Sequence, residues 1–219
     1  GTGVDLRHGD MATAFEDLAG AVDVLTCNPP YIPLEAWESV APRFQAYQLV
    51  VPGSPAFICQ PAVCTAYCCH AYSVSLSEAD VARMRRFESL EPVDFLELDE
   101  DRTPVTLPMA QPYLLARAEG HCKMLTPELG CGAYEGRPNA CRLYPHFVVF
   151  WDAGAERART NPSKRVAAAF EAAMKGKLYG PLPLLLGHSE CPGFNGEPLG
   201  EADWWPLFER TYQLQYLAE

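Results

Sequence analysis

The spacing of the cysteines constrains what this chain can fold into more than any other feature. Nine cysteines are present in 219 residues, and four of them fall within the eleven residues from Cys59 to Cys69. Thiolates are soft, charged ligands that favour zinc or iron–sulfur clusters over hard cations. We therefore expect a fold ordered around a bound metal, with these candidate ligands: Cys59, Cys64, Cys68, Cys69, Cys122, Cys131, Cys141 and Cys191.

The spacing alone does not fix the kind of metal centre. It matches neither the paired knuckles of a zinc ribbon nor a bacterial ferredoxin run. An iron–sulfur cluster is our first expectation and zinc our second. Because adjacent side chains usually diverge, we expect Cys68 and Cys69 not to share one ion, so that one serves a second site or stays free. Cys27 lies in an apolar stretch and is expected to be ordinary core.

Some neighbours of the cysteines are weaker candidates for roles at the centre. His70 and His121 each adjoin a cysteine and could supply nitrogen ligands, although a histidine in such a place is more often solvated. Arg137 and Arg142 could offset the negative charge of a thiolate-rich centre or pair with surface carboxylates.

Composition excludes several classes of function. The formal net charge is −11 and no run of Lys or Arg is present, which argues against nucleic-acid binding. No apolar run reaches the length of a membrane span, and no secretory signal is recognisable. We expect a soluble cytoplasmic protein with no membrane partner, and an unidentified protein partner stays open. In that reducing compartment, clustered cysteines hold metals more often than they form disulfides.

Residues 43–219 predict an α+β, loop-rich domain. Ser77 and Asp80 have the spacing of a capping box, so a helix should begin there. A proline should begin a short helix near Asn139. The other expected elements are a strand at 72–75, a hairpin of 114–116 with 124–125 turned at Glu119-Gly120, a core strand at 145–151, helices at 162–175 and 202–217, and a Pro/Gly-rich loop at 180–200.

The cysteine region resembles the YkgJ-like cysteine-cluster family of zinc- or iron-chelating domains. The resemblance covers about residues 57–195, and its most specific block holds Tyr134, Arg137, Pro138, Cys141 and Pro145. The first loop is spaced more loosely than the family's Cys-x2-Cys-x2-Cys-Cys. The family includes flagellin lysine N-methylases, so the resemblance implies an iron–sulfur cluster as cofactor.

Residues 1–42 resemble a fragment of the HemK/PrmC glutamine methyltransferases, which act on release factors. The resemblance rests on the turn of Asn28, Pro29, Pro30 and Tyr31, where carbonyl oxygens could accept the hydrogens of a substrate amide. The Gly-rich turn and acidic residue that hold S-adenosylmethionine are not found in this sequence. We therefore expect an incomplete, Rossmann-like α/β segment that does not bind this cofactor, and the sequence leaves open whether it is a fusion or a remnant.

These observations leave three classes of function. The first is binding of an iron–sulfur cluster or zinc, in support of redox chemistry, metal handling or protein modification. The second is a protein methyltransferase that uses S-adenosylmethionine, of the release-factor glutamine or flagellin-lysine type. The third is a structural domain stabilised by disulfides.

Overall fold

The computed structural model describes residue 41 and residues 44–152, 157–160, 163–177 and 179–217. Residues 1–40 of the expected Rossmann-like α/β segment, with Cys27 and the turn at Asn28–Tyr31, lie outside the described residues, as does the boundary at residues 42–43. These expectations therefore stay predictions.

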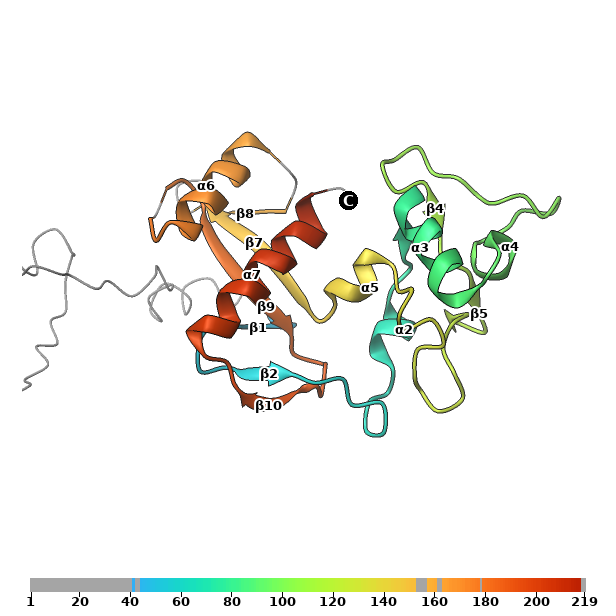
Figure 1. The fold of residues 1–219 in the computed structure, drawn as a ribbon, viewed down its shortest axis with the longest axis horizontal. Coiled ribbons are helices and arrows are strands. Elements are labelled where there is room, and N and C mark those ends of the chain that lie inside the picture. Colours follow the sequence, from blue (N-terminus) through green and yellow to red (C-terminus); the bar gives the residue numbers. More distant parts are fainter. Residues whose placement is uncertain (1–40, 42–43, 153–156, 161–162, 178, 218–219) are drawn as a thin grey trace, which may run out of the picture.

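Helices and antiparallel strands alternate along the described chain (Figure 1), which confirms the α+β class. The helices are α2 (Tyr67–Ala71), α3 (Glu78–Glu88), α4 (Pro92–Phe95), α5 (Asn139–Leu143), α6 (Lys164–Met174) and α7 (Glu201–Tyr216). The strands are β1 (Tyr47–Leu49), β2 (Pro55–Phe57), β3 (Ser75–Leu76), β4 (Tyr113–Leu114), β5 (Arg117–Ala118), β6 (His121–Cys122), β7 (His146–Asp152), β8 (Arg157–Arg159), β9 (Leu182–His188) and β10 (Phe194–Pro198).

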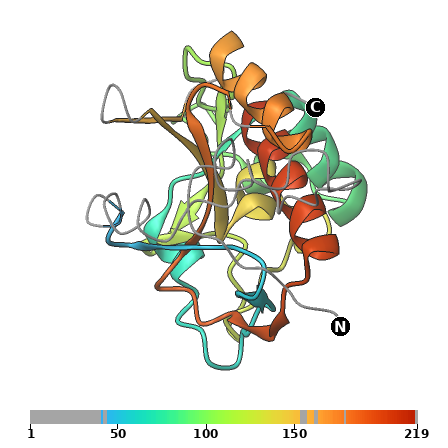
Figure 2. The same cartoon turned by 90° about the vertical axis from the view of Figure 1, so that its left-hand side faces the viewer.

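The described residues form two lobes (Figure 1). The larger lobe is built on a four-stranded antiparallel sheet in the order β1-β9-β7-β8. Helices α6 and α7 cover one face of this sheet (Figure 2). Because side chains alternate along a strand, Val148 and Phe150 of β7 enter the core under these helices, together with Leu185, Val166 and Phe208. The two-stranded ribbon of β2 and β10 lies beside the sheet.

The smaller lobe has a hydrophobic core of its own. Leu76, Met84, Phe95 and Leu115 are buried there, and Cys122 belongs to the same cluster. The lobe contains α3, α4 and two short ribbons, in which β3 pairs with β4 and β5 pairs with β6.

Two short helices lie where the lobes meet. Helix α5 contacts both α7 of the larger lobe and β3 of the smaller one, and α2 contacts β6. Both carry cysteines, Cys68 and Cys69 on α2 and Cys141 on α5.

The structure confirms several local predictions and corrects others. Ser77 and Asp80 form the predicted capping box, α5 follows Pro138, and α6 and α7 lie close to the predicted ranges. The hairpin turns at Glu119-Gly120 as predicted, but its strands are β5 and β6.

The prediction of a Pro/Gly-rich loop at 180–200 is wrong, because most of this stretch forms β9 and β10. The strand predicted at 72–75 begins later, at Ser75. In the part of the chain that the structure describes, no helix is long and apolar enough to cross a bilayer.

Candidate metal centre

A cavity of about 360 Å³ lies between the two lobes. Every cysteine that the structure describes contributes to its wall: Cys59, Cys64, Cys68, Cys69, Cys122, Cys131, Cys141 and Cys191. All of them are free thiols. The fold thus brings together cysteines that the sequence separates by up to 132 residues, the span from Cys59 to Cys191.

The β2–β10 ribbon joins the segment that carries Cys59 to the segment that carries Cys191. The backbone N–H of Ile58 donates to the carbonyl of Gly193 over 2.8 Å, which brings the segment before Cys59 against the segment after Cys191. A Cβ atom at Gly193 would lie 2.5 Å from a ring carbon of Phe57 and 2.8 Å from the carbonyl oxygen of Ile58. Only glycine therefore allows this approach without displacement.

The adjacent thiols on α2 lie side by side. The sulfur atoms of Cys68 and Cys69 are 3.9 Å apart, so our expectation that they diverge is wrong. Both cysteines lie on the short helix α2, which follows Ala66 in a left-handed conformation (φ 53°). Two thiolates bound to one tetrahedral zinc ion are about 3.8 Å apart, given Zn–S bonds of about 2.3 Å.

Hydrogen bonding couples the pKa values of three neighbouring thiols, Cys68, Cys69 and Cys122. Hydrogen bonding to Cys122 and to Cys68 raises the pKa of Cys69. The reciprocal hydrogen bond from Cys69 lowers the pKa of Cys68 to about 7. The same donor, assisted by the backbone N–H of Met124 at 3.4 Å, lowers the pKa of Cys122 to about 6. Two of the three thiols thus ionise easily, as metal ligands must.

The remaining thiols titrate less easily because they are desolvated. Burial, together with the neighbouring thiols Cys122 and Cys131, raises the pKa of Cys141 to about 12. Burial likewise raises the pKa of Cys131 and of Cys59. In each case the charge of Arg137 opposes this effect. A cation would lower these pKa values in the same way, which gives the cavity an affinity for positive charge.

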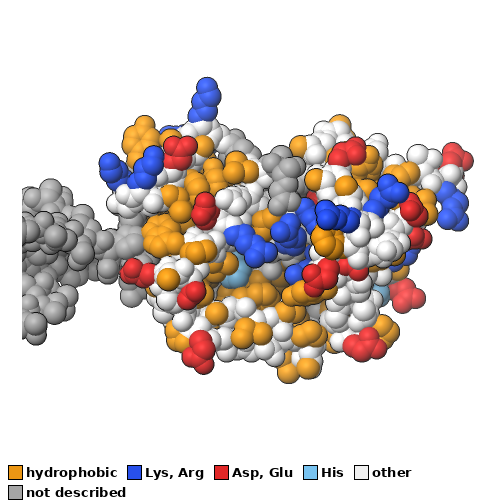
Figure 3. Space-filling model, in the orientation of Figure 1, with side chains coloured by type: hydrophobic (Ala, Val, Ile, Leu, Met, Phe, Trp, Pro, Cys, Tyr) orange, Lys and Arg blue, Asp and Glu red, His pale blue; other side chains and the backbone are white. Residues whose placement is uncertain are grey.

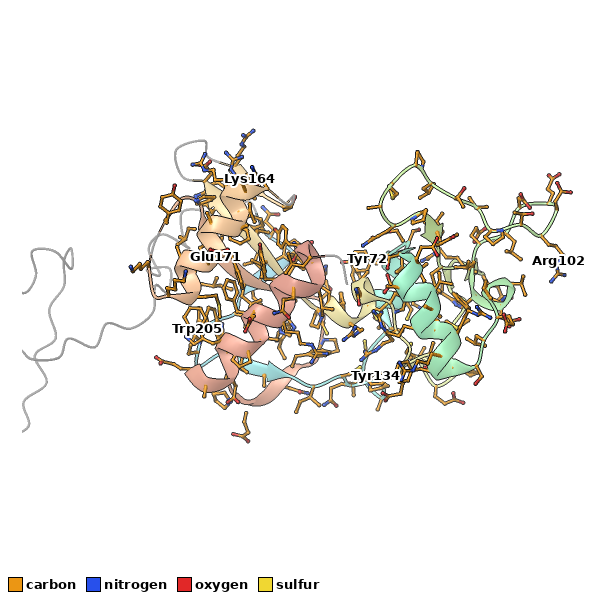
Figure 4. The ribbon with its side chains drawn as sticks, turned by 45° about the horizontal axis from the view of Figure 1, so that its top comes forward. Tyr72, Arg102, Tyr134, Lys164, Glu171 and Trp205 are labelled. Carbon is orange, nitrogen blue, oxygen red and sulfur yellow. The ribbon has the colours of Figure 1, made fainter. Side chains whose placement is uncertain are left out.

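Arg137 is held at the cavity by Tyr134. Its guanidinium lies 3.6 Å from the centre of the Tyr134 ring, and its Nε donates to the Tyr134 carbonyl over 2.8 Å. Tyr134 is half exposed and, with Tyr72, lies where the lobes meet (Figure 4). A band of Lys and Arg side chains crosses the same region above apolar side chains (Figure 3). The role that the sequence suggested for Arg137 is consistent with this position.

Arg117 also supports the centre, and the sequence analysis missed it. Its guanidinium donates to the carbonyls of His70, Tyr72 and Gly120, which fixes the C-terminal end of α2 against the β5–β6 turn. Its charge also contributes to the low pKa of Cys122. A single arginine between the two predicted strands of the hairpin gave no signal of this role.

Two buried polar groups in the cavity wall were missed as well. His146 is 6% exposed, its Nε2 atom has no hydrogen-bond partner in the described part of the chain, and burial lowers its pKa to about 4. The hydroxyl of Tyr144 is buried without a nitrogen or oxygen partner among the described residues, and it lies beside the thiol of Cys191. Only their proximity to Cys141 could have suggested them.

The other polar candidates lie away from the wall. His70 and His121 contact each other, with ring centres 5.6 Å apart, and Nδ1 of His121 is 2.9 Å from the Cys122 carbonyl. Arg142 donates to the side chain of Asn139 over 3.0 Å. None of the three is among the residues that line the cavity.

The donor atoms surround a space and do not converge on one point. Among the described residues, no three His, Cys, Asp or Glu side chains are close enough to hold one metal ion as they stand. Thiols can turn about a single torsion to close on a ligand. A thiol-lined cavity with an unpartnered imidazole fits a thiophilic metal or cluster in its chemistry.

Comparison with known proteins agrees with this reading of the donor set. The model of the CxxCxxCC family, described as "Putative zinc- or iron-chelating domain", matches residues 58–167. Cys59 through Cys141 fall inside this match, and Cys191 falls outside it. No solved structure matches the chain.

Short matches to another class of protein were also found. The chain is 64% identical over 43 residues to a release factor glutamine methyltransferase of Streptomyces coelicolor, and 35% identical over 48 residues to one of Bacillus anthracis. The matches cover 20% and 22% of this chain. The chain spans only 15% and 17% of the length of these relatives.

Proposed function

The chain belongs to the CxxCxxCC family, and from that premise we propose that it binds an iron–sulfur cluster between its two lobes. The observation that carries the proposal is the convergence of eight free thiols on one cavity of about 360 Å³. Reduced thiols persist in reducing compartments, so the proposal also places the protein in the cytoplasm.

The spread of the thiols favours a cluster over a single zinc ion. One structural zinc holds its four ligands at about 2.1–2.3 Å from a single point. A cluster distributes its thiolate ligands over several iron atoms and so accepts sulfurs that are further apart. The pair Cys68–Cys69 has the spacing of two ligands on one zinc ion, which keeps zinc as the second outcome.

Charge within the wall supports the same conclusion. A thiolate-rich centre carries net negative charge, and Arg117 and Arg137 both lower thiol pKa values in the wall. Hydrogen bonds and positive charge near cluster sulfurs are among the features that set a cluster's reduction potential. These arginines would therefore influence the potential of the centre.

The methyltransferase matches support no activity of this chain by themselves. They cover at most 22% of it, and the thiol cavity is lined by residues between 47 and 193, beyond the stretch in which we recognised the Asn-Pro-Pro-Tyr turn. Transfer of a methyl group from S-adenosylmethionine therefore remains a secondary hypothesis.

The test is anaerobic purification of the full chain, followed by quantification of iron, acid-labile sulfide and zinc. We expect a brown protein with a broad visible absorption band and with iron and sulfide in similar amounts. Cys141→Ser should lose the iron, whereas Cys27→Ser serves as the control and should keep it. A colourless protein with stoichiometric zinc would show that the site holds zinc in place of a cluster. A metal-free protein with wild-type stability would overturn the proposal.

A further inference from the structure

The wall of the cavity differs in charge from the rest of the chain. The chain has 28 Asp and Glu against 17 Lys and Arg. Among the described residues that line the cavity, none is Asp, Glu or Lys, and Arg137 is the one permanent charge. Apart from the thiols, most of the lining is apolar or aromatic. Small-molecule sites are mostly apolar hollows of about 300–1,000 Å³ with a few placed polar groups, and this cavity of about 360 Å³ has that size and composition.

The cavity opens to the surface through an apolar rim. Most of the lining is buried or half-buried, but four of its apolar side chains are exposed, namely those of Pro61, Tyr72, Leu129 and Tyr134. Tyr72 and Tyr134 belong to distant segments that meet at the junction of the lobes (Figure 4). Exposed apolar side chains that gather around a hollow are typical of binding sites. A ligand from solvent would therefore meet these side chains first.

Arg137 is held in a fixed position in this wall. Its guanidinium is stacked on the ring of Tyr134, and its Nε donates to the Tyr134 carbonyl. Its backbone is held as well, because its carbonyl accepts from Arg83 Nη1 over 3.2 Å and Pro138 follows it. An arginine that is ordered before the ligand arrives loses less conformational entropy on binding.

Two nitrogens of this guanidinium are left for a ligand. In the described part of the chain, Nη1 and Nη2 of Arg137 have no hydrogen-bond partner, and no carboxylate forms an ion pair with them. Arg83 differs in this respect, because its Nη1 donates to Asp80 over 2.7 Å. The planar pair of N–H groups on an arginine matches the two oxygens of a carboxylate.

We propose that the cavity is a binding site for a small organic carboxylate, with the carboxylate on Nη1 and Nη2 of Arg137 and the apolar part against the rim and the inner wall. A monoanion suits the site better than a phosphate dianion, because a single arginine faces a wall that also holds ionisable thiols. The site goes beyond the metal centre and does not depend on which metal is bound. The ligand and the metal would share one cavity.

Saturation-transfer difference NMR tests the site on the full chain, purified anaerobically and with its metal content measured. The probes are butyrate, hexanoate and phenylacetate, each compared with its own primary amide, and inorganic phosphate is added as a competitor. We expect each carboxylate to bind at least about tenfold more tightly than its amide, which is the effect of one hydrogen bond to a charged group. Phosphate should compete only weakly. This comparison uses the unmutated protein and needs no variant.

A pair of variants assigns the preference to Arg137. Arg137→Gln should weaken the carboxylates about tenfold and leave the amides unchanged, whereas a purely structural role would weaken both. Arg85→Gln is the matched control and should keep the preference, because Arg85 is exposed, pairs with Glu91 over 3.1 Å and does not line the cavity.

Several results would overturn the carboxylate site. They are the absence of binding by every probe, equal binding of carboxylates and amides, a preference that survives Arg137→Gln, and phosphate that competes as well as a carboxylate. Any of them in a protein that contains its iron leaves the proposed function intact. A carboxylate preference in a protein that lacks iron supports the site and overturns the cluster alone.

Discussion

Asp80 connects α3 to α5, and both helices contribute residues to the wall of the cavity. Its carboxylate is 1% exposed and accepts four hydrogen bonds. Three come from its own helix, namely the Ser77 N–H at 3.0 Å, the Ser77 hydroxyl at 2.9 Å and Arg83 Nη1 at 2.7 Å. The fourth comes from the Asn139 N–H at 2.8 Å, at the start of the helix that carries Cys141.

Asp80→Asn keeps the shape of this side chain and removes its charge and one acceptor. In the variant an NH2 group must face at least one of the donors, so one or two bonds to a charged acceptor are lost. Each contributes about 1.5–3 kcal/mol, and we expect the free energy of unfolding to fall by about 2–5 kcal/mol. For a chain of this size the melting temperature should fall by about 5–15 °C.

The pH dependence has a definite sign. Burial acts to raise the pKa of Asp80, but the hydrogen bonds from Ser77, Asn139 and Arg83 outweigh it and hold the pKa below its usual value. The stability from this depressed pKa is fully present above the unfolded value of about 3.9 and is lost as pH falls through the folded value. The difference between the wild type and Asp80→Asn should therefore shrink as the pH drops below about 4.

Thermal unfolding of both proteins at several pH values measures these effects. Asp94→Asn is the matched control, because Asp94 holds the same capping-box position in α4 but is exposed, and its carboxylate accepts from the N–H of Glu91 at the start of its own helix. We expect a much smaller change there. Equal losses in the two variants, or a difference for Asp80→Asn that grows at low pH, would refute the role of Asp80 as a buried connection between helices.

Further predictions concern the cavity and the first residues of the chain. Gly193→Ala should cost about 1–3 kcal/mol by overpacking and should lower the metal content, whereas Gly130→Ala, whose added carbon would meet its nearest neighbour at 3.4 Å, should do neither. Removal of the metal should expose the Cys59–Cys69 and Cys191 segments to protease while circular dichroism keeps most of its helical signal. Deletion of residues 1–42 should leave the metal content unchanged, since all eight wall cysteines lie downstream, and a soluble but metal-free product would contradict this. Calorimetry should detect no binding of S-adenosylmethionine to the full chain, and stoichiometric binding lost in Asn28→Ala would contradict that.

Local signals in the sequence were sufficient for part of the fold. The capping box at Ser77, the short helix after Pro138 and the turn at Glu119-Gly120 each depend on a few neighbouring residues with strong backbone preferences. The cysteine set was recognisable because thiols crowded in one segment are rare without a ligand. That these cysteines act as metal ligands stays a prediction, although their convergence on one cavity agrees with it.

Long-range contacts decided what the sequence could not show. The stretch 180–200 contains Pro183, Gly187, Pro192, Gly193 and Gly196, so it was predicted to be a loop. Yet β9 lies between β1 and β7 and gains hydrogen bonds from both strands. Two of these glycines are required by close packing instead of by a turn, because Gly187 lies under the Phe194 ring and Gly193 against Phe57.

The position of the cavity between two separate cores determines what a bound metal would stabilise. Each lobe buries apolar residues of its own. Among the described residues that form the core between the large sheet and helices α6 and α7, none is a cysteine. Protein contacts also anchor the cysteine segments, namely the Ile58–Gly193 hydrogen bond, the Asp80–Asn139 bond and Arg117 at the end of α2. A thiolate-bound metal can contribute on the order of 10 kcal/mol, and because the candidate ligands come from both lobes, much of that energy would hold the lobes together. The helices should then form without the metal, and the mutual arrangement of the lobes should depend on it.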